Sequence, residues 1–232
     1  MKRHFKTLAL MMACMAMALC VSCKKDDPSS GGDSECSGSI EGYYYVDLGL
    51  PSGTLWATCN IGAFSPYENG SYFAWGETVP KDNGFYDWTN YKWSTGDDGH
   101  YTKYNPDDNK TVLDPEDDAA RVNWGGGWRM PTRDEMVELT EKCQWKWVWM
   151  IKSFRITGPN GNSIILPAAG YIHGGGHYHV NEECRYWSNT LIPKSIDDAY
   201  FLCGEYRHVD VTTGCRYFGR SVRPVCSHQD YR

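Results

Sequence analysis

The sequence predicts an α+β fold in which short, mostly antiparallel strands accompany one main helix, one short helix and long ordered loops. The 232 residues include 24 Gly, 10 Trp and 16 Tyr, and no long helical period runs through them. Turn-forming Pro, Gly and Asn residues separate short runs rich in β-branched and aromatic residues. One strong helix-start signal begins at Thr132, the last residue of the stretch 124–132.

Residues 124–132, WGGGWRMPT, are expected to form the centre of the fold. Their three glycines permit positive φ values, and the two tryptophans supply large apolar surfaces. Pro131 pushes the residue before it out of the helical region, so the chain arrives here extended. Thr132 and Glu135 match the capping-box pattern. A helix is therefore predicted to begin at Thr132.

This main helix is predicted to be amphipathic and to dock on a core. Met136, Leu139 and Cys143 share one face at helical spacing, and charged residues occupy the other face. A short helix is expected just before the central stretch, because Asp117 and Asp118 are good N-cap residues.

Turn signals divide the rest of the chain into strands. Two strands are expected within residues 42–62, joined by a turn at 50–53 that contains Pro and Gly. A hairpin is predicted around the GPNG turn at 158–161. Its strands are residues 153–157 and 163–166. Further strands are expected near residues 186–190, 200–204, 207–212 and 220–225.

Residues 65–111 have little periodicity but many aromatic side chains. Disordered segments lack this much aromatic surface, so the region is predicted to form ordered loops. Trp75, Trp88 and Trp93 are the side chains expected to pin these loops to the core.

The N-terminus has the pattern of an export signal. Basic residues precede an apolar run at residues 8–21, which is too short for a comfortable membrane span, so residues 1–22 are predicted to be a signal peptide. The run ends in CVSC and then turns polar, which resembles a bacterial lipoprotein box with Cys23 as the lipidated residue. The alternative is an ordinary secreted protein cut near Ser22.

Residues 23–41 are predicted to be a flexible linker, because Ser, Gly and Asp residues cannot bury enough apolar surface to become ordered. Residues 24–27, KKDD, resemble the acidic export tag of lipoproteins that Bacteroides-type bacteria place outside the outer membrane. The expected location is therefore the cell surface, with a lipid anchor in the outer membrane. Residues 42–226 are the predicted domain and 227–232 a C-terminal tail.

The net charge narrows the classes of molecule that the chain is expected to bind. Without residues 1–22 the chain keeps 20 basic and 29 acidic residues, a net charge of −9, which argues against nucleic acid as a partner.

Without residues 1–22 the chain keeps eight cysteines, or seven that are able to form disulfides if Cys23 carries lipid. Cys59, Cys143 and Cys226 are taken as the structural set, with no connectivity deduced.

Six segments, in order and spacing, carry a family resemblance. They are YVDLGLPSGTLWATCNIGA, YFAWGET, DDAARVNWGGGWRMPT, ITGPNGNSIILPAAGY, YWSNT and GRSVRPV. Together they resemble the Fibrobacter succinogenes major paralogous domain of lipoproteins in Bacteroides-type bacteria, over nearly all of residues 42–226. The resemblance implies a C-type lectin-like fold, in which a small twisted sheet and helices support a long irregular loop region that displays a binding face. The GWRMPT segment is also similar to the GFRLPTEAEWE signature of formylglycine-generating enzymes.

Some proteins with such domains are variable targets of diversity-generating retroelements, which alter exposed positions just before the closing strand. Here the corresponding segment is residues 186–220, with Trp187, Leu202 and Val209 as expected core positions. The expected exposed ligand-binding positions are Tyr186, Asn189, Phe201, Cys203, Glu205, Arg207, His208, Asp210, Tyr217 and Arg220. Such a mixture of aromatic and polar residues suits recognition of a protein or glycan ligand. The alternative is that these are ordinary solvent-facing strand residues.

A glycine-rich loop adds His173, His177 and His179 to the ligand-binding candidates. With Glu182, Glu183 and Cys184 nearby, these imidazoles also offer zinc ligands, but their spacing matches no zinc pattern and no metal site is predicted. Acidic clusters offer weak calcium candidates, although none reproduces a calcium-loop pattern; they are residues 97–98, 107–108 and 114–118. No cofactor is expected.

The leading hypothesis is a binding module and not an enzyme. A formylglycine-generating site needs two closely spaced reactive cysteines, whereas Cys203 and Cys215 are twelve positions apart in segments unlike that motif. No nucleophile elbow, Walker loop or H-E-x-x-H motif occurs. Two alternatives stay open: an oxidase of this type that uses Cys203 or Cys215, and a structural subunit of a surface fibre.

Overall fold

The computed structural model describes residues 36–96, 99–193 and 197–227. Residues Gly31–Arg232 form one compact unit. The described part is a mixed α+β fold with mostly antiparallel strands, which confirms the predicted fold class. The predicted signal peptide and Cys23 lie outside the described residues, as do most of the linker and of the C-terminal tail.

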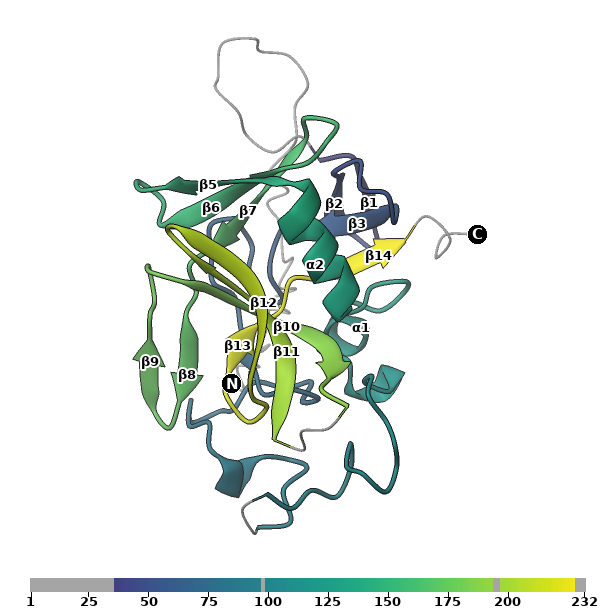
Figure 1. The fold of residues 1–232 in the computed structure, drawn as a ribbon, viewed down its shortest axis with the longest axis vertical. Helices are drawn as coiled ribbons and strands as arrows, with labels where there is room; N and C mark the ends of the chain where they lie inside the picture. The colour runs from purple at the N-terminus through teal and green to yellow at the C-terminus, as the bar shows by residue number, and fades with distance from the viewer. Residues whose placement is uncertain (1–35, 97–98, 194–196, 228–232) are drawn as a thin grey trace, which may run out of the picture. The chain divides into compact units, whose positions relative to one another are not determined.

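The first sheet brings the two ends of the described chain together (Figure 1). Its order is β1-β2-β3-β14, formed by β1 (Gly38–Ile40), β2 (Tyr43–Asp47), β3 (Thr54–Ala57) and β14 (Val225–Ser227). The predicted turn between β2 and β3 closes with a 2.9 Å hydrogen bond from Gly53 N to Leu50 O. Strand β1 lies inside the stretch predicted to be linker, so ordered structure begins earlier than the composition indicated.

The second sheet has the order β12-β11-β10-β13-β4. Its strands are β4 (Tyr72–Phe73), β10 (Cys184–Leu191), β11 (Asp198–Glu205), β12 (His208–Cys215) and β13 (Arg220–Ser221). The single closing strand predicted at residues 220–225 is wrong, because the chain leaves this sheet after β13 and enters the first sheet as β14. Buried Arg223 holds the crossing by donating to the carbonyl oxygens of Ala57, Thr58 and Ile165.

The third sheet contains the hairpin expected around the GPNG turn. Its order is β5-β6-β7, with β5 (Gln144–Val148), β6 (Ser153–Thr157) and β7 (Ser163–Pro167). The glycine-rich histidine loop is itself a small hairpin of β8 (Tyr171–His173) and β9 (Gly176–Tyr178).

The helices begin where the sequence predicts. The short helix α1 (Ala119–Trp124) is capped by Asp118, whose side chain accepts from the backbone N–H groups of residues 120 and 121. The main helix α2 (Arg133–Lys142) begins after Thr132, with both hydrogen bonds of the capping box present, and it buries Met136 and Leu139. No helix in the described ranges has the length and apolarity needed to cross a membrane.

The loops of residues 65–111 are ordered wherever the structure describes them. They contain the 3₁₀ helix η1 (Trp88–Asn90), and a second one, η2 (Pro115–Asp117), follows them. Trp75 is fully buried and donates to Ser188 O, while the indole N–H of Trp93 donates to Gly76 O. These bonds attach the loops to β10 and to one another, as the aromatic content predicts.

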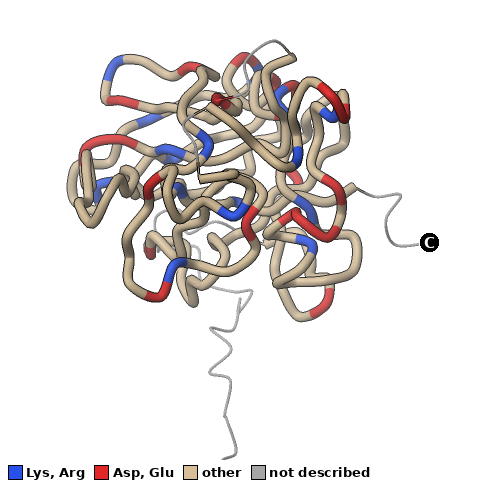
Figure 2. The backbone as a smooth tube through the Cα atoms, turned by 90° about the horizontal axis from the view of Figure 1, so that it is seen from below, with Lys and Arg blue, Asp and Glu red and all other residues tan. Residues whose placement is uncertain are grey.

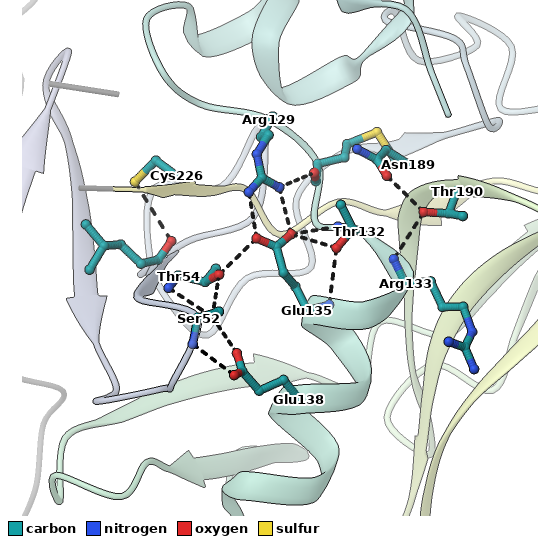
Figure 3. A network of polar contacts seen from close by, with 12 residues as sticks. Ser52, Thr54, Arg129, Thr132, Arg133, Glu135, Glu138, Asn189, Thr190 and Cys226 are labelled. Atoms are coloured by element: carbon teal, nitrogen blue, oxygen red, sulfur yellow. Dashed lines mark hydrogen bonds and ion pairs between the residues drawn. The ribbon is translucent and has the colours of Figure 1, made fainter. Parts of the chain in front are cut away.

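The central stretch joins α2 to β3 through a partly buried polar network (Figure 3). Arg129 donates two hydrogen bonds of 2.6 and 2.7 Å to the two carboxylate oxygens of Glu135. Glu135 also accepts from the Thr54 hydroxyl at 2.9 Å. Burial acts to raise the pKa of Glu135, but the bonds and charge of Arg129 outweigh it and hold the pKa below its ordinary value. Each of these bonds fixes the start of α2 against the first sheet.

The cysteine prediction is not supported by the structure. No disulfide joins any two described cysteines, and this includes Cys59, Cys143 and Cys226. Cys226 is buried with its sulfur 3.8 Å from Leu55 O, so it packs in the core as a small apolar side chain.

Candidate ligand-binding surface

The two faces of the β10-β11-β12 hairpin system have different neighbours. Leu202 is fully buried, and its cross-strand partner Val211 packs against the core cluster that contains Met136 and Leu139 of α2. On the other face Cys203 lies opposite Asp210, and Glu205 lies opposite His208. Side chains alternate between the two faces of a strand, so this second face is the one that solvent reaches near the β11–β12 turn.

The three residues of this segment that were expected in the core are buried or partly buried. Trp187 and Leu202 are fully buried, and Val209 is partly buried against the same cluster as Val211. The inward half of the predicted alternation is therefore correct for these three residues.

Four of the predicted exposed positions are buried, and for them the expectation of an exposed binding side chain is wrong. They are Tyr186, Asn189, Phe201 and Arg220, with relative exposures of 1%, 6%, 3% and 1%. Strands β10, β11 and β13 lie inside a five-stranded sheet, and loops and helices cover both faces at this level.

Tyr186 and Asn189 have structural partners. The Tyr186 hydroxyl donates to Pro167 O at 2.8 Å and accepts from the Asn60 amide at 3.1 Å. The Asn189 side chain accepts from the Thr190 hydroxyl, which in turn accepts from the backbone N–H of Arg133 at the start of α2 (Figure 3). Both residues thus connect β10 to neighbouring elements.

Arg220 is an internal cation between aromatic rings. Its guanidinium carbon lies 4.0 Å from the ring centre of Trp187 and 3.9 Å from that of Phe201. Burial lowers the pKa of Arg220 to about 9, and the nearby charge of Arg185 adds to this effect. Cation–π contacts take the place of a carboxylate partner here, so the side chain is part of the core.

The β11–β12 turn carries the predicted candidates that remain accessible. Glu205, Arg207, His208 and Asp210 are exposed. The two other candidates in this segment, Cys203 and Tyr217, are only partly accessible.

The β8–β9 hairpin presents the three predicted histidines together with an aromatic stack. His177 and His179 are exposed, whereas His173 is partly buried, 4.5 Å from the ring centre of Phe218. Tyr171 lies between Tyr178 and Phe218, with ring centres 5.3 and 5.4 Å away and ring planes tilted by 22° and 14°.

Sequence reasoning missed the three stacked rings. Tyr171 and Tyr178 stand beside the histidines in the same segment, and Phe218 lies 40 positions further on. The alternation of Tyr and His was a usable signal for the first two. Only the fold brings Phe218 to them.

A buried acid links the β8–β9 hairpin to β10. Glu183, 8% exposed, lies 2.9 Å from His179 Nδ1 and 2.6 Å from Arg185 Nη2. The guanidinium of Arg185 in turn lies 4.6 Å from the ring centre of Tyr171. We call the accessible side chains of the β8–β9 and β11–β12 hairpins, together with Tyr217, the binding face. Its members are His173, His177, Tyr178, His179, Glu205, Arg207, His208, Asp210 and Tyr217.

The structure does not assemble the zinc ligands that the sequence offered. Cys184 is fully buried, away from the exposed histidines, and burial raises the pKa of its thiol. Glu183, Cys203 and Glu205 do have ligand atoms within 4.8 Å of one another. However, Arg185 already neutralises Glu183, and burial raises the pKa of Cys203 to about 11, which keeps a proton on the sulfur at neutral pH.

In the acidic cluster at residues 114–118, lysine side chains form ion pairs with the carboxylates of Asp114 and Asp117. Lys103 Nζ lies 2.6 Å from a carboxylate oxygen of both Asp114 and Asp117, and Lys92 Nζ lies 2.9 Å from the other oxygen of Asp117. These ammonium groups stand where a calcium ion would have to bind. Of the other two calcium candidates, residues 97–98 lie outside the described ranges. In the third, the Asp108 carboxylate accepts backbone N–H bonds from Tyr104 and Lys110 and so is used in the turn.

Cys203 and Cys215 do not form the close pair that a formylglycine-generating type of site requires. Cys203 lies opposite Asp210, and Cys215 lies opposite Asp198, on the β11–β12 ladder. Five positions along a strand separate these two levels, a distance of roughly 17 Å. Burial also raises the pKa of both thiols, which lowers their reactivity.

Charged residues are interspersed along the described chain. Figure 2 shows acidic and basic positions interspersed on neighbouring segments of the described chain.

Comparison of the chain with protein-family models, with curated proteins and with solved structures finds no match. The α+β architecture therefore rests on the structure itself, and the lectin-like identity stays a prediction.

Proposed function

We propose that this chain is a lipid-anchored, surface-displayed binding module, in which a lectin-like scaffold presents the binding face to a protein or glycan ligand. The observation that carries the proposal is the binding face itself. Exposed His, Tyr, Arg and Asp side chains come from two hairpins, β8–β9 and β11–β12, whose strands belong to different sheets. Glu183, which lies 2.9 Å from His179 and 2.6 Å from Arg185, also has a carboxylate oxygen within 4.8 Å of one from Glu205 at the end of β11, so the two hairpins lie near each other.

The chemistry of this face suits recognition. Tyr178 is 44% exposed while its ring is fixed by stacking on Tyr171, so it offers contact area with little loss of side-chain entropy on binding. His177, Arg207 and Asp210 add directional donors and acceptors of both charge signs. All three side chains are exposed, so none of them belongs to the core.

The proposal includes diversification by a retroelement, and the structure restricts where that diversification is tolerable. Glu205, Arg207, His208 and Asp210 are exposed, so substitutions there are expected to leave the core intact. A template repeat in the flanking DNA should therefore differ from the gene mainly at these codons. Differences concentrated at the buried codons for Tyr186, Phe201 or Arg220 would contradict the idea.

The direct test uses residues 31–232, because Gly31–Arg232 is a compact unit that includes every described strand pairing and core contact. Glycan arrays and arrays of extracellular proteins are probed with this chain. A triple variant, Tyr178→Ala with Arg207→Ala and His208→Ala, is expected to lose the captured ligand while its Tm stays within about 3 °C of the parent. Val122→Ala, at an exposed α1 position, is the matched control. Full retention of binding by the triple variant would show that the ligand does not bind at the binding face.

A further inference from the structure

Two turns that are far apart in sequence expose apolar side chains next to each other. Trp149 in the β5–β6 turn and Tyr206 in the β11–β12 turn have ring centres 5.0 Å apart. Trp149 is 59% exposed, Tyr206 52% and Met150 95%. Figure 1 shows the two turns on the same side of the fold, at the left of the view. We call the surface formed by Trp149, Met150, Lys152, Tyr206 and Arg207 the tip patch.

The β5–β6 turn has an unusual composition for a turn in water. Turns are normally formed by Gly, Asn, Asp, Pro and Ser, whereas this one contains Trp149, Met150 and Lys152, the last with a φ of 48°. Trp149 makes an edge contact with Trp147 below it, but Met150 is almost fully accessible. An apolar side chain left almost fully accessible at a turn, beside two partly exposed aromatic rings, points to an interaction.

Cations accompany both rings of the tip patch. Lys152 Nζ lies 5.4 Å from the ring centre of Trp149, and the Arg207 guanidinium lies 5.5 Å from that of Tyr206. The nearest acid in the sequence, Glu205, has a carboxylate oxygen within 4.8 Å of both Cys203 and Glu183, so its charge is directed toward β10. On a chain with a net charge of −6, this tip is locally apolar and basic.

We propose that the tip patch inserts into the headgroup region of an anionic lipid surface. Trp and Tyr favour the boundary between water and lipid, because each has an apolar ring and a polar group. The Met150 side chain at the apex would enter the acyl boundary, and Lys152 and Arg207 would face lipid phosphates. The contact would dock the domain on the membrane to which Cys23 is proposed to be attached, and in this respect it rests on the proposed function.

Chain length makes this contact geometrically accessible. Cys23 precedes Cys36, the first described residue, by 13 positions. A fully extended chain of that length spans at most about 47 Å. A lipid on Cys23 would therefore hold the start of the domain within this distance of the bilayer, which raises the effective concentration of the domain at the membrane, so a weak contact is sufficient for docking.

Lipid fits the tip patch better than the other ligand classes. A stable protein interface needs roughly 800 Å² on each partner, far more than three side chains on two turns provide. A sugar site needs convergent polar groups to fix hydroxyls, and the tip patch contains no Asn, Gln, Asp or Glu. An apolar apex with basic residues at its base is the pattern of membrane-surface binding.

The test is sedimentation of residues 31–232, which lack Cys23, with vesicles of phosphatidylcholine mixed with phosphatidylglycerol or of phosphatidylcholine alone. The parent is expected to bind the mixed vesicles. Met150→Ser, and Met150→Ser combined with Trp149→Ser, should weaken that binding, the double variant by roughly tenfold or more. Lys152→Ser with Arg207→Ser should abolish the preference for the mixed vesicles.

Phe64→Ser is the matched control, because Phe64 is 94% exposed and lies outside the tip patch. Its vesicle binding should equal that of the parent. Equal binding by the parent and the Met150→Ser and Trp149→Ser variants would overturn the proposal. So would a parent that fails to bind mixed vesicles at low salt, or one that binds only a glycan through this patch. Arg207 belongs to both surfaces, so the binding face is tested separately by Tyr178→Ala and His208→Ala, which leave the tip patch intact and are measured against array ligands.

Discussion

Replacing Glu135 by Gln tests whether the central stretch fixes α2 to the first sheet. The side chain of Glu135 is only 13% exposed, it receives both hydrogen bonds from Arg129, and it closes the capping box on Thr132. Removing one partner of a largely buried ion pair costs about 3 kcal/mol, whereas Gln at this position can still close the capping box, so the loss reports on the ion pair. In a domain of this size a loss of about 3 kcal/mol lowers Tm by roughly 6–12 °C.

The same variant carries a pH signature with a defined sign. The folded-state pKa of Glu135 lies below its ordinary value, so its contribution to stability is present above the unfolded pKa of about 4.3 and is lost as the pH falls through the folded value. The difference between parent and Glu135→Gln is therefore expected to be largest near neutral pH and to shrink in acid.

Urea unfolding followed by circular dichroism, across a range of pH values, measures this difference. Glu141→Gln on the same helix is the control, because the Glu141 side chain is 62% exposed and its ion pair with Lys142 is long, at 4.0 Å. A loss below about 0.5 kcal/mol for Glu135→Gln at neutral pH, or a loss that does not change in acid, would refute the reasoning.

Three further predictions concern residues that organise the second sheet and the β8–β9 hairpin. Arg220→Ala should cost about 3 kcal/mol by emptying the space between Trp187 and Phe201, with a smaller loss for Arg220→Met; equal urea midpoints for Arg220→Ala and the parent would contradict this. Tyr186→Phe should cost about 1–2 kcal/mol in the same assay, because Asn60 loses a buried acceptor. Gly170→Ala should lower Tm and disturb the aromatic stack seen by near-UV circular dichroism, because its φ is 60° and a Cβ there would lie 2.0 Å from Tyr178 O. An unchanged near-UV spectrum for Gly170→Ala would show that β9 adjusts without strain.

Local signals in the sequence predicted the parts of the fold that local chemistry controls. The capping box at Thr132, the N-cap at Asp118 and the GPNG turn each depend on residues within a few positions of one another. The residues that identify each feature are neighbours in sequence, so these predictions could be made without knowing how the distant chain folds.

Such local signals could not predict which residues of the second sheet are buried. Alternation shows which residues share a side of a strand, but it does not show how many layers cover that side. Phe201 and Glu205 share one side of β11, yet one is buried under the sheet's neighbours and the other is exposed near the turn. The depth of each position follows from β10 lying between β11 and β13, a pairing set by residues far apart in the chain.

Surfaces formed by distant segments were predicted only in part. The histidines of the β8–β9 hairpin and the exposed residues of the β11–β12 turn were identified, because each set is continuous in sequence. The tip patch joins Trp149 to Tyr206, which are 57 positions apart, and no periodic pattern connects them. Strand β1 was likewise hidden by its polar composition, because its order comes from pairing with β2.

Recognition through the binding face is measured by a binding isotherm for a ligand captured on the arrays. Residues 31–232 and the variants Tyr178→Ala, His208→Ala and Val122→Ala would be titrated with that ligand under identical conditions. Tyr178→Ala and His208→Ala are each expected to weaken binding by about tenfold or more, while the affinity of Val122→Ala and the melting temperatures of all three variants stay close to the parent. Identical affinities for the parent, Tyr178→Ala and His208→Ala would show that recognition takes place elsewhere on the molecule.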